Sequence, residues 1–339
     1  LLKSLSLQCF LNEFVFFQTS EEMNIIKKIE IELNKKAENN EMLQSNMLLC
    51  LGAYKKIGNL SWSKSIIYND DIKEVFKILV SDILLENAIK IRLPSLKEIS
   101  NETSKLIQTQ YNENPFPRWF LKTNNKKNTF EEFIKIEKLK DFPNVDDFDK
   151  PLSILIAGCG TGQHPITIAQ QFPDSKIIAI DLSKDSLAYA LRKTKEYEIN
   201  NIQYMQADIL DLSYLNMKFN LIECSGVLHH MENPDLGLKK LINILDKNGI
   251  MKIGLYSKLA RTEISTFRHL FSAKTKSFSQ DNIRHLRNNI LMKKEKKFEQ
   301  FVKIPLLNDF YSMSGIRDLL FNFKEHTFNI NQISNLLDM

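Results

Sequence analysis

The chain has 339 residues, of which 43% are hydrophobic and 26% are charged, and its formal net charge is +5. This length and balance predict a globular protein of more than one domain with a sizeable buried core. The lysines are scattered among Asn, Glu and Ile residues, so the modest positive charge gives no strong signal for nucleic acid. No run of about 18 uninterrupted apolar residues occurs, and we expect no membrane-spanning helix.

The four cysteines, Cys9, Cys50, Cys159 and Cys224, form no Cys-x-x-Cys pair and have no metal-ligand spacing with histidines. We therefore expect neither a disulfide framework nor a bound metal, and a reducing, cytoplasmic location fits best. Residues 1–7 lack the basic head and the small-residue cleavage site of a signal peptide. Because the chain does not begin with methionine, we expect the native protein to extend further toward its N-terminus.

Residues 1–110 predict a helical domain. Apolar residues recur there at helical spacing, as at Leu48, Leu49, Leu51 and Tyr54. No internal period of about 34 residues is visible, so a helical repeat array, if there is one, lies upstream.

Residues 111–150 predict a short motif followed by a polar linker. The motif, Tyr111-Asn-Glu-Asn-Pro-Phe-Pro-Arg118-Trp119, contains two prolines, which lack an N–H and bias their predecessors away from the α region. We therefore predict an extended segment. It is either a lid that folds over a ligand, with Arg118 binding a carboxylate, or a linker that packs its aromatic rings on the domain surface. The sequence leaves both alternatives open.

Residues 151–257 alternate between apolar runs and helical patterns. We predict strands near residues 152–157, 176–180, 202–205, 219–224 and 249–256, and helices near residues 163–172, 184–197 and 235–246. This alternation is typical of a Rossmann-like, doubly wound α/β fold with a mostly parallel sheet, whose ligand binds at the carboxyl ends of the strands. We expect Asn248-Gly249 to end the last of these helices.

The first strand runs into a glycine turn, Gly158-Cys-Gly160-Thr-Gly162, and the second strand ends in Asp181. Glycine allows a sharp turn with backbone N–H groups close to a ligand, and an acid about 20 residues later can accept from a ribose diol. These features predict a nucleoside-binding unit. The dinucleotide fingerprint has its third glycine one residue later, where this chain has Gln163, so the spacing favours S-adenosylmethionine over NAD.

The segment from Leu152 to Ser257 resembles class I S-adenosylmethionine-dependent methyltransferases. The resemblance rests on the glycine turn and on three further stretches, Ile180-Asp-Leu-Ser-Lys-Asp-Ser-Leu, Gln206-Ala-Asp-Ile-Leu and Phe219-Asn-Leu-Ile-Glu-Cys-Ser-Gly-Val-Leu-His-His. It implies S-adenosylmethionine as the cofactor, with Asp181 on the ribose and Asp208 on the adenine amino group. Together with Arg118 of the lid alternative, the expected cofactor residues are Gly158, Cys159, Gly160, Thr161, Gly162, Asp181, Leu182, Asp208, Ile209, Ser225 and Arg118.

One position departs from the family pattern. Its members usually carry an acid two residues before the first glycine, and this chain has Ile156 there. We expect another group to take its place. Residues 8–16, together with the motif from Tyr111 to Trp119, also resemble a bacterial group of methyltransferases that follow tetratricopeptide-repeat segments.

Residues 258–339 predict a helical cap or extension, with C-terminal truncation expected because no strand pair follows. The candidate catalytic residues are His229, His230 and Tyr311, and Arg317 and His326 are further candidates for contact with a methyl acceptor. We expect one histidine of the pair to be packed structurally and the other, by preference His229, to accept a proton near an ordinary pKa of about 6.5. Tyr311 and Arg317 either roof the acceptor pocket or satisfy one another.

The favoured hypothesis is an enzyme that moves the methyl group of S-adenosylmethionine onto a nitrogen, oxygen or carbon atom of a small-molecule or protein acceptor. The alternative is a non-catalytic cofactor-binding or interaction module that has kept the fold, which Ile156 favours. An NAD-dependent oxidoreductase is disfavoured by Gln163. The sequence leaves the acceptor and the oligomeric state open.

Overall fold

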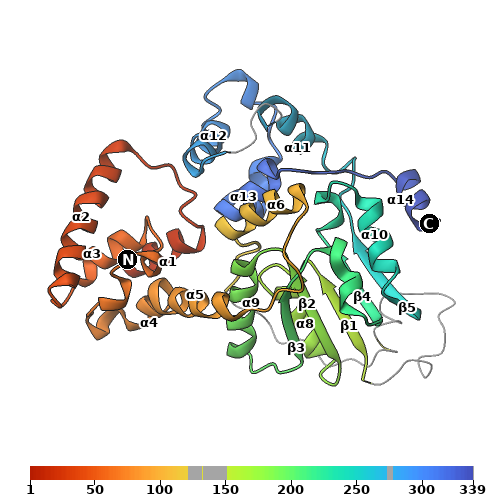
Figure 1. Cartoon of the computed structure of the whole chain (residues 1–339). Helices are drawn as coiled ribbons and strands as arrows, with labels where there is room; N and C mark the ends of the chain where they lie inside the picture. The colour runs from red at the N-terminus through yellow and green to blue at the C-terminus, as the bar shows by residue number, and fades with distance from the viewer. Residues whose placement is uncertain (121–131, 133–150, 273–277, 339) are drawn as a thin grey trace. The chain divides into compact units, whose positions relative to one another are not determined.

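The computed structural model describes residues 1–120, 132, 151–272 and 278–338. Contacts between residues group the chain into two units (Figure 1). Unit 1 contains Leu1–Ala88 and Glu263–Phe321, and unit 2 contains Ile89–Thr262 and Asn322–Met339. This grouping differs from the predicted ranges 1–110, 111–150, 151–257 and 258–339, because the N-terminal helices share a unit with most of the region after residue 262. The polar linker predicted before residue 150 lies outside the described residues, apart from Glu132.

Unit 1 is built from helices, as predicted for both ends of the chain. Its helices are α1 (Leu2–Leu11), α2 (Ser20–Glu38), α3 (Ser45–Gly52), α4 (Lys73–Phe76), α11 (Thr262–Phe267), α12 (Gln280–Met292) and α13 (Met313–Phe321), and α5 (Asp82–Arg92) leads into unit 2. Local chemistry sets the start of α2, where the Thr19 side chain accepts from the Glu22 amide and the Glu22 carboxylate accepts from the Thr19 amide at 2.7 Å. Leu48 and Leu51 of the predicted helical pattern are buried in its core.

Hydrogen bonds at residues 12–14 join the two sequence-distant parts of unit 1. In the turn after α1, the Asn12 carbonyl accepts a hydrogen bond from the Met313 amide at 3.1 Å. The Glu13 carboxylate accepts one from the Ser314 amide at 2.7 Å. Arg284 of α12 donates to the carbonyl of Phe14 at 2.7 Å. Residues 12–14 therefore tie the N-terminal helices to α12 and α13.

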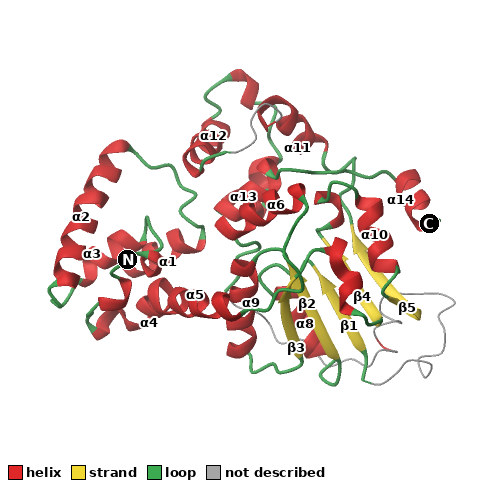
Figure 2. Ribbon diagram, viewed as in Figure 1, coloured by secondary structure: helices red, strands yellow, loops and turns green. Residues whose placement is uncertain are grey.

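Unit 2 contains a five-stranded, wholly parallel sheet (Figure 2). Its strands are β1 (Ser153–Ala157), β2 (Lys176–Asp181), β3 (Ile202–Gln206), β4 (Phe219–Ser225) and β5 (Leu245–Gly254). They lie in the order β3-β2-β1-β4-β5, so the direction of winding reverses between β1 and β4. The predicted Rossmann-like, doubly wound fold is confirmed, and ligands of such sheets bind outside the carboxyl ends at the point of reversal.

Helices cover both faces of this sheet. The helices of unit 2 are α6 (Glu102–Glu113), α8 (Gln163–Gln171), α9 (Lys184–Glu196), α10 (Pro234–Ile242) and α14 (Ile330–Leu337). Alternate residues of β1 point to opposite faces, so Ile154 packs with Ile168 of α8, whereas Leu155 packs with Leu238 of α10. None of the described helices combines the length and the apolar character that crossing a membrane requires.

The end of α10 corrects one prediction. The helix ends at Ile242, and β5 begins at Leu245, so Asn248-Gly249 does not end a helix but lies inside a strand. The pairing of β5 with β4 shifts register there, and a Cβ on Gly249 would lie 2.9 Å from the carbonyl oxygen of Phe219. Glycine allows the close backbone approach that this irregularity needs.

Candidate functional site

The glycine turn connects β1 to α8 and requires its glycines. Gly158, Gly160 and Gly162 have φ angles of +75°, +51° and +86°, in the left-handed region that favours glycine. A Cβ on Gly158 would lie 2.2 Å from a methyl carbon of Val227, and one on Gly160 would lie 2.5 Å from the carbonyl oxygen of Phe116. The turn is thus held tightly between the loop after β4 and the segment that follows α6.

Between these glycines, Cys159 and Thr161 are buried. Burial, and secondarily the nearby Asp181 carboxylate, raises the pKa of the Cys159 thiol well above its usual value. The thiol is therefore neutral and acts as a small packing group rather than as a nucleophile.

Asp181 fastens the end of β2 to this turn. Its Oδ2 accepts from the Gly160 amide at 2.8 Å, and its Oδ1 accepts from the Ser183 amide at 2.9 Å. Burial raises the pKa of Asp181, and the backbone hydrogen bonds act in the opposite direction. A carboxylate has about four lone-pair sites, so these two bonds leave capacity to accept from ligand hydroxyls. The next residue, Leu182, is half-buried, and its carbonyl accepts from Gln206 at 2.9 Å.

Asp208 and Ile209 follow β3 at the same edge of the sheet. Both are buried, and Asp208 caps a short 3-10 helix, Ile209–Leu215, by accepting from the Leu210 amide at 3.0 Å. At the end of β4, by contrast, Ser225 and the following Gly226 are exposed. The structure therefore brings the expected residues of β1, β2, β3 and β4 to one edge of the sheet in unit 2.

The motif after α6 lies against the glycine turn. Helix α6 reaches Glu113, so Tyr111 is helical, and the predicted extended backbone begins only at Asn114. Trp119 is buried, and its indole N–H donates to the Thr161 carbonyl at 3.1 Å, while the Thr161 hydroxyl donates to the carbonyl of Pro117. The segment therefore covers the turn with its backbone.

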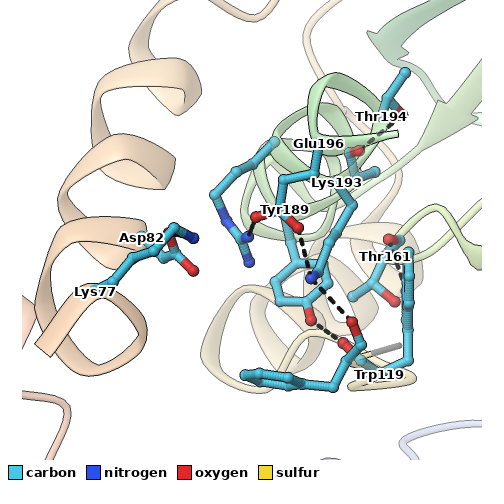
Figure 3. Close-up of polar contacts among 11 residues, drawn as sticks. Lys77, Asp82, Trp119, Thr161, Tyr189, Lys193, Thr194 and Glu196 are labelled. Carbon is cyan, nitrogen blue, oxygen red and sulfur yellow. Dashed lines mark hydrogen bonds and ion pairs between the residues drawn. The ribbon is translucent and has the colours of Figure 1, made fainter. Parts of the chain in front are cut away.

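Helix α9 holds this segment from the other side (Figure 3). The Tyr189 hydroxyl donates to the Trp119 carbonyl, and Lys193 donates to the Phe120 carbonyl at 3.1 Å. The Arg118 guanidinium lies 5.6 Å from the centre of the Tyr189 ring. The aromatic packing agrees with the linker alternative, and the lid alternative stays a prediction. The expected contact of Arg118 with a ligand carboxylate stays a prediction.

A further carboxylate lies beside this turn. Glu223 of β4 has only 2% of its side chain exposed, and its Oε2 lies 2.6 Å from Nε2 of His164 in α8. It pairs in register with Ile156 of β1, where the usual acid is missing. The signal was present in the sequence, because Glu223 is a charged residue within an apolar strand, but only the strand register shows which residue it neighbours.

The histidine pair after β4 is buried. His229 is fully buried, and its ring centre lies 3.7 Å from that of Tyr256. Burial, followed by the charges of His230 and Arg261, lowers the pKa of His229 to about 2. Such a histidine is neutral and only weakly basic, so this geometry does not support the preference for His229 as the proton acceptor.

His230 and His326 make backbone contacts that hold residues 322–328 to the same loop. Nδ1 of His230 lies 2.7 Å from the Lys324 carbonyl oxygen, and Nε2 of His326 lies 3.0 Å from the Met231 carbonyl oxygen. The His326 amide also donates to the His229 carbonyl at 2.7 Å. The rings of His230 and His326 therefore have structural partners within unit 2, whereas His229 takes part through its backbone carbonyl.

Tyr311 and Arg317 belong to unit 1, whereas the glycine turn and the histidines belong to unit 2. The Tyr311 hydroxyl donates to the carbonyl of Pro305 at 2.9 Å, and 43% of the residue is exposed. The role of these two residues at an acceptor stays a prediction from the sequence.

Comparison with known proteins finds a methyltransferase match within the chain. Residues 148–302 match the protein family described as "Methyltransferase domain". This match, together with the sheet order and the glycine turn, supports a class I methyltransferase domain with S-adenosylmethionine as its cofactor.

Among curated proteins, an uncharacterized protein of a Synechococcus strain is 39% identical over 112 residues, which cover 33% of this chain and 27% of that protein. The malonyl-acyl-carrier-protein O-methyltransferase of Acetivibrio thermocellus is 26% identical over 145 residues, which cover 41% of this chain and 49% of the enzyme. The chain thus spans about a quarter and about half of these relatives. Among solved structures, PKMT2 from Rickettsia typhi in complex with AdoHcy is 21% identical, with a TM-score of 0.47, over 64% of this chain and 44% of that chain.

Proposed function

We propose that this protein transfers the methyl group of S-adenosylmethionine to a nucleophilic nitrogen, oxygen or carbon atom of a small-molecule or protein acceptor. The observation that carries the proposal is the hydrogen bond between Asp181 and the Gly160 amide, because it places an acid of β2 against the left-handed glycine turn of β1. A glycine turn and a carboxylate at this edge suit a nucleoside that carries an amino-acid group.

Each part of this cofactor has a proposed partner in the chain. Asp181 would accept from the ribose hydroxyls, and Asp208, with the Ile209 amide beside it, would bind the adenine. Arg118 would bind the methionine carboxylate through its planar fork of donors. When bound, the cofactor supplies an electrophilic methyl group on a sulfonium. The protein then has to align the acceptor atom with that methyl group and exclude competing water.

The residues proposed to lie near the methyl acceptor rest on different kinds of evidence. His229 and His230 remain the catalytic candidates from the sequence, and the His229 carbonyl and the His230 ring also hold residues 322–328 beside the loop after β4. Tyr311 remains a candidate for contact with the acceptor from the sequence.

Residues 8–16 and the motif from Tyr111 to Trp119 favour membership in the bacterial group that follows tetratricopeptide-repeat segments. By analogy with such proteins, helical modules that present docking surfaces favour a protein or peptide acceptor, and a cytoplasmic location is part of the proposal.

The test is incorporation of label from S-adenosyl-[methyl-tritium]methionine by the full chain in a bacterial cell extract, separated into protein and small-molecule fractions. A suitable control is Gly160→Ala, because the added Cβ would lie 2.5 Å from the Phe116 carbonyl oxygen. We expect label in one fraction with the wild-type chain and much less with the variant. Binding of S-adenosylhomocysteine without any methyl transfer would instead favour the non-catalytic module, to which the missing acid at Ile156 points.

A further inference from the structure

We propose that Glu223 binds the ammonium group of S-adenosylmethionine and that His164 is the positioning residue that orients its carboxylate. The inference rests on the proposed function, since it assigns a contact within the same cofactor site. It means that β4 supplies the acid that β1 lacks.

The position of Glu223 follows from strand register. Glu223 pairs with Ile156, which lies two residues before Gly158. The two strands are the neighbours between which the sheet reverses its winding, and the crevice at that point is the usual ligand position in open α/β sheets. Residues paired in a parallel sheet project to the same face, so the carboxylate occupies the side of β1 on which α8 begins.

One oxygen of the Glu223 carboxylate lacks a hydrogen-bond donor among the described residues. The side chain is 2% exposed, and Oε2 is bonded to His164. Among the described residues, no hydrogen-bond partner reaches the buried Oε1. A buried carboxylate oxygen without a donor is unfavourable, and a cationic donor supplies the strongest compensation. Lys252 stands opposite Glu223 on β5, but its side chain is exposed.

The chemistry of the cofactor identifies the donor. Its two cationic groups are the sulfonium and the ammonium, and only the ammonium carries N–H groups for a carboxylate oxygen. Asp181 and Asp208 are assigned to the ribose and the adenine, which leaves the methionine end for the junction of β1 and β4. Ser225 and Gly226 are exposed at that junction, so a ligand has access to the strand end.

His164 explains why one oxygen faces the ligand. It lies in the first turn of α8, directly after the glycine turn, and its Nε2 fixes Oε2 at 2.6 Å. This contact leaves Oε1 as the oxygen for the ammonium. A purely structural alternative is that the pair only fastens α8 to β4, and the two explanations predict different results when the ligand is changed.

The experiment makes two changes, singly and together. Glu223→Gln removes the carboxylate from the protein, and a deaminated analogue removes the ammonium group from the ligand. Calorimetry measures the affinity of the wild-type full chain and of Glu223→Gln for S-adenosylhomocysteine and for its analogue with hydrogen in place of the α-amino group. We expect Glu223→Gln to weaken S-adenosylhomocysteine binding about tenfold or more and to leave the affinity for the deaminated analogue within about twofold. The matched control is Glu232→Gln, an exposed acid shortly after the histidine pair, for which we expect neither affinity to change.

Equal effects of Glu223→Gln on both ligands, or no effect on either, would overturn the inference and leave the pair a structural contact. Thermal unfolding checks whether the glutamine variant folds. If it does not, Glu223→Asp is used instead, because it keeps the charge but shortens the side chain by one methylene. We then expect a smaller loss of affinity for S-adenosylhomocysteine and again little change for the deaminated analogue. An Asp variant that weakens both ligands equally would contradict the inference. A wild-type chain that binds neither ligand would instead refute the proposed function.

Discussion

The carboxylate of Asp181 and the amide of Gly160 are joined by a hydrogen bond of 2.8 Å between the end of β2 and the turn after β1. The same carboxylate also accepts a hydrogen bond from the amide of Ser183, the N-cap residue of α9. One side chain therefore sets the geometry of the turn and, in the proposed function, also contacts the ribose. Removing it should affect both the stability of the fold and cofactor affinity.

We predict that Asp181→Ala weakens S-adenosylhomocysteine binding by about 1.5 to 3 kcal/mol for each charge-assisted hydrogen bond to the ribose that is lost. Isothermal titration calorimetry on the full chain measures this change. Asp174→Ala, which removes an exposed acid from the loop before β2, is the matched control and should bind like the wild type. An unchanged affinity in Asp181→Ala would mean that the ribose lies elsewhere.

Trp119 links the segment after α6 to the glycine turn through its indole N–H and the Thr161 carbonyl. We predict that Trp119→Phe lowers the free energy of unfolding by about 1 kcal/mol through the lost hydrogen bond and also weakens cofactor binding. Urea denaturation and calorimetry measure the two effects. Trp62→Phe is the control, because Trp62 is equally buried but belongs to the core of unit 1. Equal losses of cofactor affinity in both variants would show that the Trp119 contact has no specific role.

Burial lowers the pKa of His229 to about 2, well below the value near 6.5 in an unfolded chain. The unfolded state therefore binds a proton below pH 6.5 that the folded state does not, so His229 makes the protein less stable as the pH falls. Between pH 7 and pH 5 this contribution is about 2 kcal/mol. We predict that His229→Phe, which keeps a ring against Tyr256, removes that part of the pH dependence in urea denaturation. Identical pH slopes for variant and wild type would show that His229 titrates normally.

Arg261 and Glu325 form an ion pair with 10% and 3% of their side chains exposed, and Arg261 also lies over the ring of Tyr256 at 3.8 Å. Removing one member of a buried pair leaves the other charge uncompensated, so we predict that Glu325→Gln destabilises the protein by about 3 kcal/mol. Thermal and urea unfolding measure it. Glu232→Gln, which breaks the exposed pair with Lys324, should change stability little, and a similar loss in the two variants would contradict the assigned role of burial.

The sequence predicted the parallel sheet well, because its strands are apolar runs separated by glycine, asparagine and helical patterns. It failed at Gly249, where a glycine that resembled a helix end lies within an irregular strand. Local rules could not distinguish the two, since the register shift depends on the neighbouring strand. Tyr111 was also placed in extended backbone, but the helix continues past it to Glu113, as the prolines restrict only their nearest predecessors.

The candidate site was predictable where one motif sufficed and not where two distant motifs meet. The turn glycines and Asp181 are recognisable because their spacing in the chain reflects their spacing in the fold. The pairing of Ile156 with Glu223 required the β1 and β4 register, which joins residues 67 positions apart. The pKa of His229 likewise depends on burial by residues from several elements, which no single stretch of sequence specifies.

The most direct test of the account is a calorimetric titration of the wild-type full chain with S-adenosylhomocysteine and, separately, with NAD. The glycine turn, the Asp181 contact with Gly160 and the larger residue at Gln163 predict saturable, one-to-one binding of S-adenosylhomocysteine and no detectable heat with NAD. Binding of NAD in the absence of any affinity for S-adenosylhomocysteine would contradict the assignment of this site to S-adenosylmethionine.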